Sequence, residues 1–209
     1  VVTGISTGLT QGFSIQLSQY YGAKDFENLR KSLAHSYRLT AFIAAGVLIL
    51  SQSFASLVLT GLHTPSNIIG MSLLYLRIIF CGIPATAAYN MFASALRAMG
   101  NSKTPLSAMI IASVLNVSLD ILFVAGFGWG VAGAAIATVI AQSFSAVYCF
   151  LILRRIDIVH LTRADFMPAS GMNARLMKLG IPVVFQNIII GVGLSLIHIS
   201  EPTRHAQIS

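Results

Sequence analysis

Long apolar stretches separated by short polar connections constrain this chain more than any other feature of its sequence. An α-helix needs about 20 predominantly apolar residues to cross the hydrocarbon core of a bilayer. Only 9% of the residues are charged, against roughly a quarter in soluble domains. The sequence therefore predicts an all-α, polytopic bundle of transmembrane helices. The predicted spans are Val1–Tyr21, Leu39–Thr60, Ile68–Leu96, Leu106–Phe127, Gly130–Leu153 and a sixth that begins at Leu179.

Lysine and arginine residues are concentrated in alternate connections. Successive connections carry four, none, two, none and five of these cations. Cytoplasmic loops of membrane proteins carry an excess of Lys and Arg. We therefore expect residues 22–38, 97–104 and 154–178 to be cytoplasmic, in a multi-pass protein of the cell membrane. The net charge of +7 follows from these loops and predicts no nucleic-acid partner.

Two local patterns add detail to the predicted spans. The segment Gly82-Ile83-Pro84 lies inside the third span, where proline and glycine predict a kink. The basic segment 22–38 predicts a short interfacial helix, and its His35 is expected to be solvated.

Asp120 is the only acidic residue deep inside an apolar run. A charged Asp at the centre of a membrane helix costs roughly 2.5–3.5 kcal/mol, so such a residue is interpreted as functional by default. Asn116 precedes it by one helical turn and shares its face. Asp120 lies nine residues before Trp129 and Thr138 nine residues after it. In an antiparallel hairpin that turns at Trp129, a rise of about 1.5 Å per residue puts the two side chains at the same depth.

Asn116, Asp120 and Thr138 therefore form the candidate site. Their carboxylate, amide and hydroxyl oxygens suit a hard cation or a proton, and no cofactor or resident metal is expected beyond a coupling Na⁺. Each residue also has a structural interpretation. Asp120 and Asn116 could hydrogen-bond neighbouring helices, and Thr138 continues a small-residue line with Gly130 and Ala134 that allows close helix packing.

Four further polar side chains in the predicted spans are candidates for lining a cavity or for structural contacts. Arg77 lies about ten residues into the third span. It could snorkel, line a cavity or pair with an acid elsewhere in the protein, and structural pairing is favoured. The glutamines fit a substrate path and polar packing equally well. They are Gln11, Gln16 and Gln186.

Six segments, taken in order, resemble the MATE family of multidrug and toxin extrusion transporters. The resemblance runs in register along 1–193 and covers nearly the whole chain. The segments are GAKDFENLRKSLAHS, YLRI followed by GIP, LRAMGNSKTPL, NVSLD, GVAGAAIATVIAQ and LGIPVVFQ.

The resemblance implies a partial amino-terminal lobe. Residues 1–153 would correspond to helices two to six, 154–178 to the cytoplasmic connection between lobes, and 179–193 to the start of helix seven. A complete member has twelve helices in two lobes around a central cavity. Helix one and the carboxy-terminal lobe of the same protein would then be partners of this segment.

The resemblance also implies a function and a role for the candidate site. In members with a cation site in the amino-terminal lobe, an Asn and an Asp on helix five join a Thr on helix six. These positions match Asn116, Asp120 and Thr138, while a further family acid would precede Val1. The implied function is not enzymatic: a secondary transporter, embedded in lipid, exports cationic or amphipathic drugs in antiport with Na⁺ or H⁺.

Other functions remain open from the sequence alone. A lipid-linked oligosaccharide flippase has related architecture. A membrane enzyme would need clustered acids or histidines near a membrane face, whereas this chain has one isolated buried Asp. A non-transport membrane subunit would not need Asp120 at all.

The last segment, 194–209, differs from the rest. It begins LSLIHISEPTR and resembles a translated sequencing adapter. We expect the native protein to continue with apolar residues after Gly193, and we assign this segment no function.

Overall fold

The structure is a computed structural model that describes residues 2–61, 68–167 and 171–205. These residues form helices and connections without a strand, so the predicted all-α class is confirmed. Short helical turns lie at η1 (Ile121–Gly126), η2 (Asp157–Val159) and η3 (Arg163–Phe166). The main helices are α1 (Val2–Gly22), α2 (Phe26–Gly61), α3 (Ile69–Cys81), α4 (Ile83–Ala98), α5 (Lys103–Asp120), α6 (Gly130–Arg154) and α7 (Met172–His205).

Five stretches of the described residues are long and apolar enough to cross a membrane. This finding agrees with the predicted multi-pass membrane bundle. The predicted first span forms α1 with nearly the expected bounds, but α1 is more polar and is not among the five. They are Phe26–Gly61, Ile69–Ala98, Lys103–Gly126, Gly130–Arg154 and Met172–Gly191.

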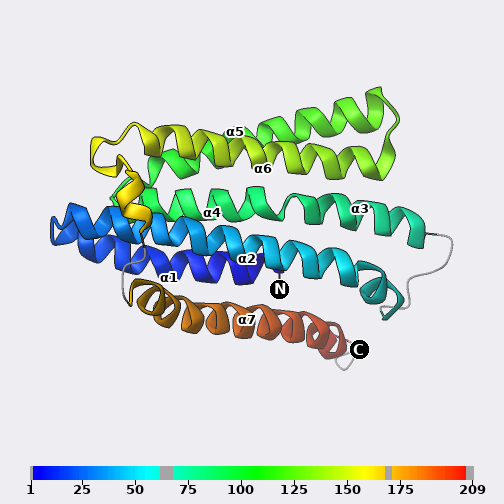
Figure 1. The fold of residues 1–209 in the computed structure, drawn as a ribbon. Coiled ribbons are helices and arrows are strands. Elements are labelled where there is room, and N and C mark those ends of the chain that lie inside the picture. Colours follow the sequence, from blue (N-terminus) through cyan, green and yellow to red (C-terminus); the bar gives the residue numbers. More distant parts are fainter. Residues whose placement is uncertain (1, 62–67, 168–170, 206–209) are drawn as a thin grey trace.

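The helices lie side by side, and their connections alternate between two ends of the bundle (Figure 1). The α1–α2, α4–α5 and α6–α7 connections share one end, which we call the basic end because the Lys and Arg clusters lie there. The turn between η1 and α6 lies at the opposite end. The alternation matches the charge pattern of the sequence.

The α1–α2 connection is much shorter than expected. Only Ala23–Asp25 separate the two helices, and α2 runs unbroken from Phe26, so the separate interfacial helix over 22–38 is wrong. Lys24 makes the turn with a left-handed φ of 58°. Asp25 then accepts hydrogen bonds from the backbone and side chain of Asn28 at 3.2 and 2.7 Å, which lower its pKa. From there no Gly or Pro interrupts the helix until Gly46.

The predicted kink in the third span is confirmed. The helix breaks at Gly82, between the end of α3 and the start of α4, and Pro84 lies in the first turn of α4. Proline tolerates that position because the first turn of a helix lacks partners for its N–H groups anyway. A Cβ at Gly82 would lie 2.9 Å from Val139 Cγ2 of α6, so glycine also permits close packing there.

The hydrophobic core lies toward the basic end of the bundle. It joins side chains from α1, α2, α4, α6 and α7, and burial of such side chains is the main favourable term in packing them together. The structure also begins α7 at Met172 rather than at Leu179, so the start of that helix belongs to the core. Fully buried members include Phe13, Leu17, Leu29, Leu33, Met91, Leu96, Leu153 and Leu176.

The backbones of α1 and α7 approach very closely. A Cβ on Gly12 would lie 2.3 Å from Gly180 Cα, and one on Gly8 would lie 2.8 Å from Val184 Cα. Real Cβ atoms do not occur at such distances. Glycine at both positions is therefore what allows the two helices to touch, as small residues do at helix contacts in membranes.

Candidate cation site between α5 and α6

The hairpin that carries the candidate site has an unusual turn. Directly after α5 the chain winds more widely in the π-helix η1, and the Phe127 N–H donates to Leu122 O, five residues back, at 2.9 Å. The rings of Phe123 and Trp129 stack with centroids 5.2 Å apart. A Cβ on Gly133 would lie 3.0 Å from Phe123 Cβ. The aromatic turn thus holds α6 close against η1.

Asn116 and Thr138 face each other across this hairpin. Asn116 Nδ2 donates to Thr138 Oγ1 at 3.4 Å. Thr138 Oγ1 in turn donates to Ala134 O at 3.0 Å within α6. Both residues are partly buried. The structure therefore brings two of the three predicted site residues into contact.

The register of the hairpin differs from the expectation. We expected Thr138 to lie at the depth of Asp120, but its contact comes from Asn116, one turn earlier. The estimate assumed a regular α-helix up to the turn. The structure has a π-helix over Ile121–Gly126, whose i→i+5 bonds close wider turns. These residues therefore take up less axial length and shift the pairing.

Asp120 is the last residue of α5 and lies directly before the π-helix. The residue is half-buried, and its Oδ1 atom is fully buried with no hydrogen-bond partner among the described residues. A buried acceptor without a partner is costly, and more so when it carries charge. Such an exception in a folded protein needs an explanation.

A cavity of about 190 Å³ opens beside the Asn116–Thr138 pair. Three helices, α4, α5 and α6, supply its walls. Sequence reasoning missed several of its polar residues. Helical spacing could have indicated those on α5 and α6. Ser113 lies three residues before Asn116, Gln142 four residues after Thr138, and Ser145 seven residues after Thr138. Tyr89 belongs to α4 and gave no such signal. The missed residues are Tyr89, Ser113, Gln142 and Ser145.

A comparison with protein families decides the identity of this helix bundle. The MatE family model matches residues 1–122, more than half of the chain. The chain belongs to the MatE family. The family predicted from the sequence motifs is thereby confirmed.

Relatives of this MatE chain include two named proteins. The chain is 32% identical over 187 residues to the probable multidrug resistance protein YpnP of Bacillus subtilis, covering 90% of this chain and 42% of that protein. It is 24% identical over 195 residues to the multidrug export protein MepA of Staphylococcus saprophyticus, covering 92% of this chain and 43% of that protein. The chain thus spans less than half the length of these relatives.

Solved structures share the fold. A crystal structure of MATE in the bent conformation matches with a TM-score of 0.87 at 22% identity, over 92% of this chain and 44% of that chain. An inward-facing multidrug resistance MATE family transporter of the MOP superfamily matches with a TM-score of 0.83 at 23% identity, over 89% of this chain and 43% of that chain.

Arg77 and Gln186 lie apart from the candidate site in this MatE chain. Arg77 is exposed on α3 and forms no ion pair within the described residues. Its backbone carbonyl accepts from Gln52 Nε2 of α2 at 2.9 Å. Gln186 is exposed on α7. The structure thus offers Arg77 no acid within the described chain, and pairing with an acid elsewhere in the protein stays a prediction.

Gln11 and Gln16 belong to the contact between α1 and α7. Gln11 Oε1 accepts from Asn187 Nδ2 at 3.3 Å. Gln16 is buried, and its Nε2 lies 3.2 Å from Met172 Sδ and 3.3 Å from the Tyr20 hydroxyl. Gln16 Oε1 is buried with no hydrogen-bond partner among the described residues. Packing and a substrate path both stay predictions for the two glutamines.

His35 is not solvated, contrary to the expectation. The residue is only 2% exposed. Its Nδ1 lies 2.8 Å from Asn173 Oδ1 of α7, and its Nε2 lies 3.1 Å from Met167 O of the α6–α7 connection. Arg38 of α2 also donates to Phe166 O at 2.9 Å. The basic end of α2 therefore fastens the α6–α7 connection, a role that the polar character of the segment concealed.

Proposed function

We propose that this chain is the amino-terminal part of a transporter that exports drugs in exchange for a cation, and that Asp120 carries the cation. Membership of the MatE family supports drug export, as do relatives named multidrug resistance and multidrug export proteins. Because the chain spans less than half the length of those relatives, the activity belongs to the whole protein.

One observation supports the site more than any other. Asp120 has a buried carboxylate oxygen without a hydrogen-bond partner in the described chain, and the Asn116–Thr138 pair lies one turn away. A bound proton or Na⁺ would satisfy that oxygen. Na⁺, as a hard cation, prefers oxygen ligands. The Asn116 amide donates to Thr138 through its nitrogen, which leaves its carbonyl oxygen to face a cation.

In this proposal, Asp120 alternates between a cation-bound and a free carboxylate. Loading neutralises the charge and favours one arrangement of the helices. Release favours the other, because a ligand shifts a conformational equilibrium by its difference in affinity for the two states. Sites near the bilayer midplane that bias such a two-state cycle are usual in secondary transporters. Cationic or amphipathic drugs would be exported on the opposite half of the cycle.

The test replaces the charge while keeping the shape. Asp120→Asn in the full-length protein should abolish drug efflux driven by a sodium or proton gradient in membrane vesicles, with the amount of inserted protein unchanged. Efflux is normalised to inserted protein. If Asp120 served packing alone, the variant would show less folded protein or would retain gradient-driven efflux. Full efflux by Asp120→Asn would remove this residue from the mechanism.

A further inference from the structure

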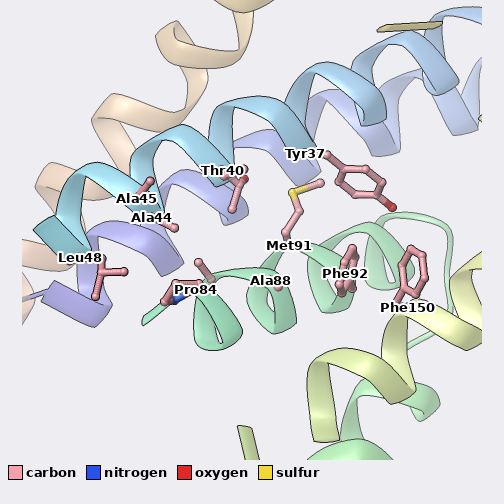
Figure 2. Close-up of a pocket in the computed structure, with 12 residues that line it drawn as sticks. Tyr37, Thr40, Ala44, Ala45, Leu48, Pro84, Ala88, Met91, Phe92 and Phe150 are labelled. Atoms are coloured by element: carbon pink, nitrogen blue, oxygen red, sulfur yellow. The ribbon is translucent and has the colours of Figure 1, made fainter. Parts of the chain in front are cut away.

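An apolar groove runs between α2 and α4, away from the candidate cation site. Its volume is about 370 Å³. Figure 2 shows Leu48 and Pro84 at one end, and Tyr37, Phe92 and Phe150 gathered at the other. Nearly every lining side chain is aliphatic or aromatic. The groove therefore suits a hydrocarbon chain.

A second cavity continues the groove toward the basic end. It has a volume of about 240 Å³ and shares Tyr37 and Phe150 with the first. Arg154, the last residue of α6, and His160 also line it. Asp157 Oδ1 lies 3.8 Å from His160 Nε2, so a carboxylate already neighbours that imidazole. Among the described residues no carboxylate forms an ion pair with Arg154, which supplies the cation at this mouth.

A buried hydroxyl lies inside the apolar groove, one helical turn from Tyr37, which both cavities share. Thr40 lines the groove, is 9% exposed, and its Oγ1 has no hydrogen-bond partner among the described residues. It follows Tyr37 by three residues on α2, or about 4.5 Å along the helix axis. The two cavities match the order of groups in a glycerophospholipid. The cation lies where the phosphate would bind, the hydroxyl where the ester would lie, and the apolar groove where an acyl chain would lie.

We propose that these two cavities bind an anionic phospholipid from the membrane leaflet at the basic end. Its phosphate would contact Arg154, its ester would reach Thr40, and one acyl chain would fill the groove between α2 and α4. Charge complementarity selects this occupant, since basic pockets between membrane helices attract anionic headgroups. The site is separate from Asp120, and the proposal does not rest on the proposed transport function.

The test measures lipid retained by the full-length protein in native mass spectrometry, after exchange into equal amounts of phosphatidylglycerol and phosphatidylcholine. Arg154→Gln should reduce the amount of bound phosphatidylglycerol about fivefold, which corresponds to the binding free energy that one basic residue contributes near an anionic surface. The amount of bound phosphatidylcholine should be unchanged. Arg155→Gln is the matched control, because Arg155 is exposed and lines neither cavity.

A second pair of variants tests the groove. Ala45→Phe, and the smaller Ala45→Leu if the first lowers the yield, should reduce retention of both lipids. Ala125→Phe, on the exposed surface of η1, should not. The proposal would be overturned if Arg154→Gln retained as much phosphatidylglycerol as the wild-type protein. It would also be overturned if the Ala45 variants retained as much of both lipids as the wild-type protein. A wild-type protein that retains no lipid would overturn it as well, because another segment of the protein would then fill the groove.

Discussion

Side chains one turn apart on α5 have different roles in the candidate site. Asn116 contacts Thr138 across the hairpin, while Asp120 has a buried oxygen without a partner. Sequence reasoning selected Asp120 because an acid inside an apolar helix is costly and therefore conspicuous, and it selected Asn116 and Thr138 by their spacing from Asp120; the roles of all three stay predictions. It placed Thr138 level with Asp120 rather than with Asn116, since a π-helix over Ile121–Gly126 leaves no periodic signal in an apolar run.

Substitution of Asn116 should weaken the coupling of drug efflux to the cation gradient more than substitution of Thr138. Asn116→Ala should reduce gradient-driven efflux about fivefold, as expected when one hydrogen bond of roughly 1 kcal/mol near a charge is lost. Thr138→Ala should have a smaller effect, because that hydroxyl already donates within its own helix. Thr138→Ser, which keeps the hydroxyl, is the control. Equal losses for Thr138→Ser and Thr138→Ala would mean that the methyl group matters and not the oxygen.

The buried His35 should contribute to stability. His35→Ala removes the hydrogen bonds to Asn173 and to Met167 O, each with a net contribution of roughly 0.5–1.5 kcal/mol, and the packing of a buried ring. Thermal unfolding of the purified protein in detergent should show a lower midpoint. His160→Ala provides the control, because the His160 side chain is 68% exposed. An unchanged midpoint for His35→Ala would contradict the fastening role.

At the scale of elements, the sequence predicted the break between α3 and α4 but not the continuity of α2. Proline and glycine act on the backbone locally, so the kink at Gly82 can be predicted from the residues of that segment alone. The charged residues of 26–38 look like a surface helix. Leu29, Leu33 and His35 nevertheless point one face of it into the core, and tertiary packing of this kind overrides what local polarity indicates.

The contact between α1 and α7 should depend on glycine. Gly12→Ala would place a Cβ 2.3 Å from the backbone of Gly180, so the two helices must separate, at a cost of about 1–3 kcal/mol. Gly46→Ala is the matched control, because nothing lies within 4 Å of its Cβ position and alanine favours helix. Thermal unfolding in detergent would separate the two variants. Similar midpoints would mean that the helices do not touch at Gly12.

At the scale of the whole molecule, apolar length and cation placement were enough to predict the bundle. Span length follows from bilayer thickness, and the alternation of Lys and Arg assigns the ends. Span length and cation placement can both be read directly along the sequence. The lateral order of the helices is different, because packing of α1 against α7 or of α4 against α6 depends on which small residues meet. For that reason the cavity near Tyr89 was not predicted.

We predict that the basic end of the bundle faces the cytoplasm. In a background without Cys81 and Cys149, Ser102→Cys should be protected from an impermeant thiol reagent added outside intact cells. Ser102 adjoins Arg97 and Lys103 at the basic end. Ser66→Cys should react, because its connection carries no cation; Ser66 itself lies outside the described residues. The reverse labelling pattern would invert the topology.

The glycine contact between α1 and α7 also closes one gap between neighbouring helices. Because the two backbones meet with no side chain between them at Gly12 and Gly180, that seam leaves no room for a lipid tail, a drug or a file of water molecules. Side chains can swing aside to admit a molecule, but touching backbones can only separate as whole helices. A molecule could pass between α1 and α7 at this level only if the two helices moved apart.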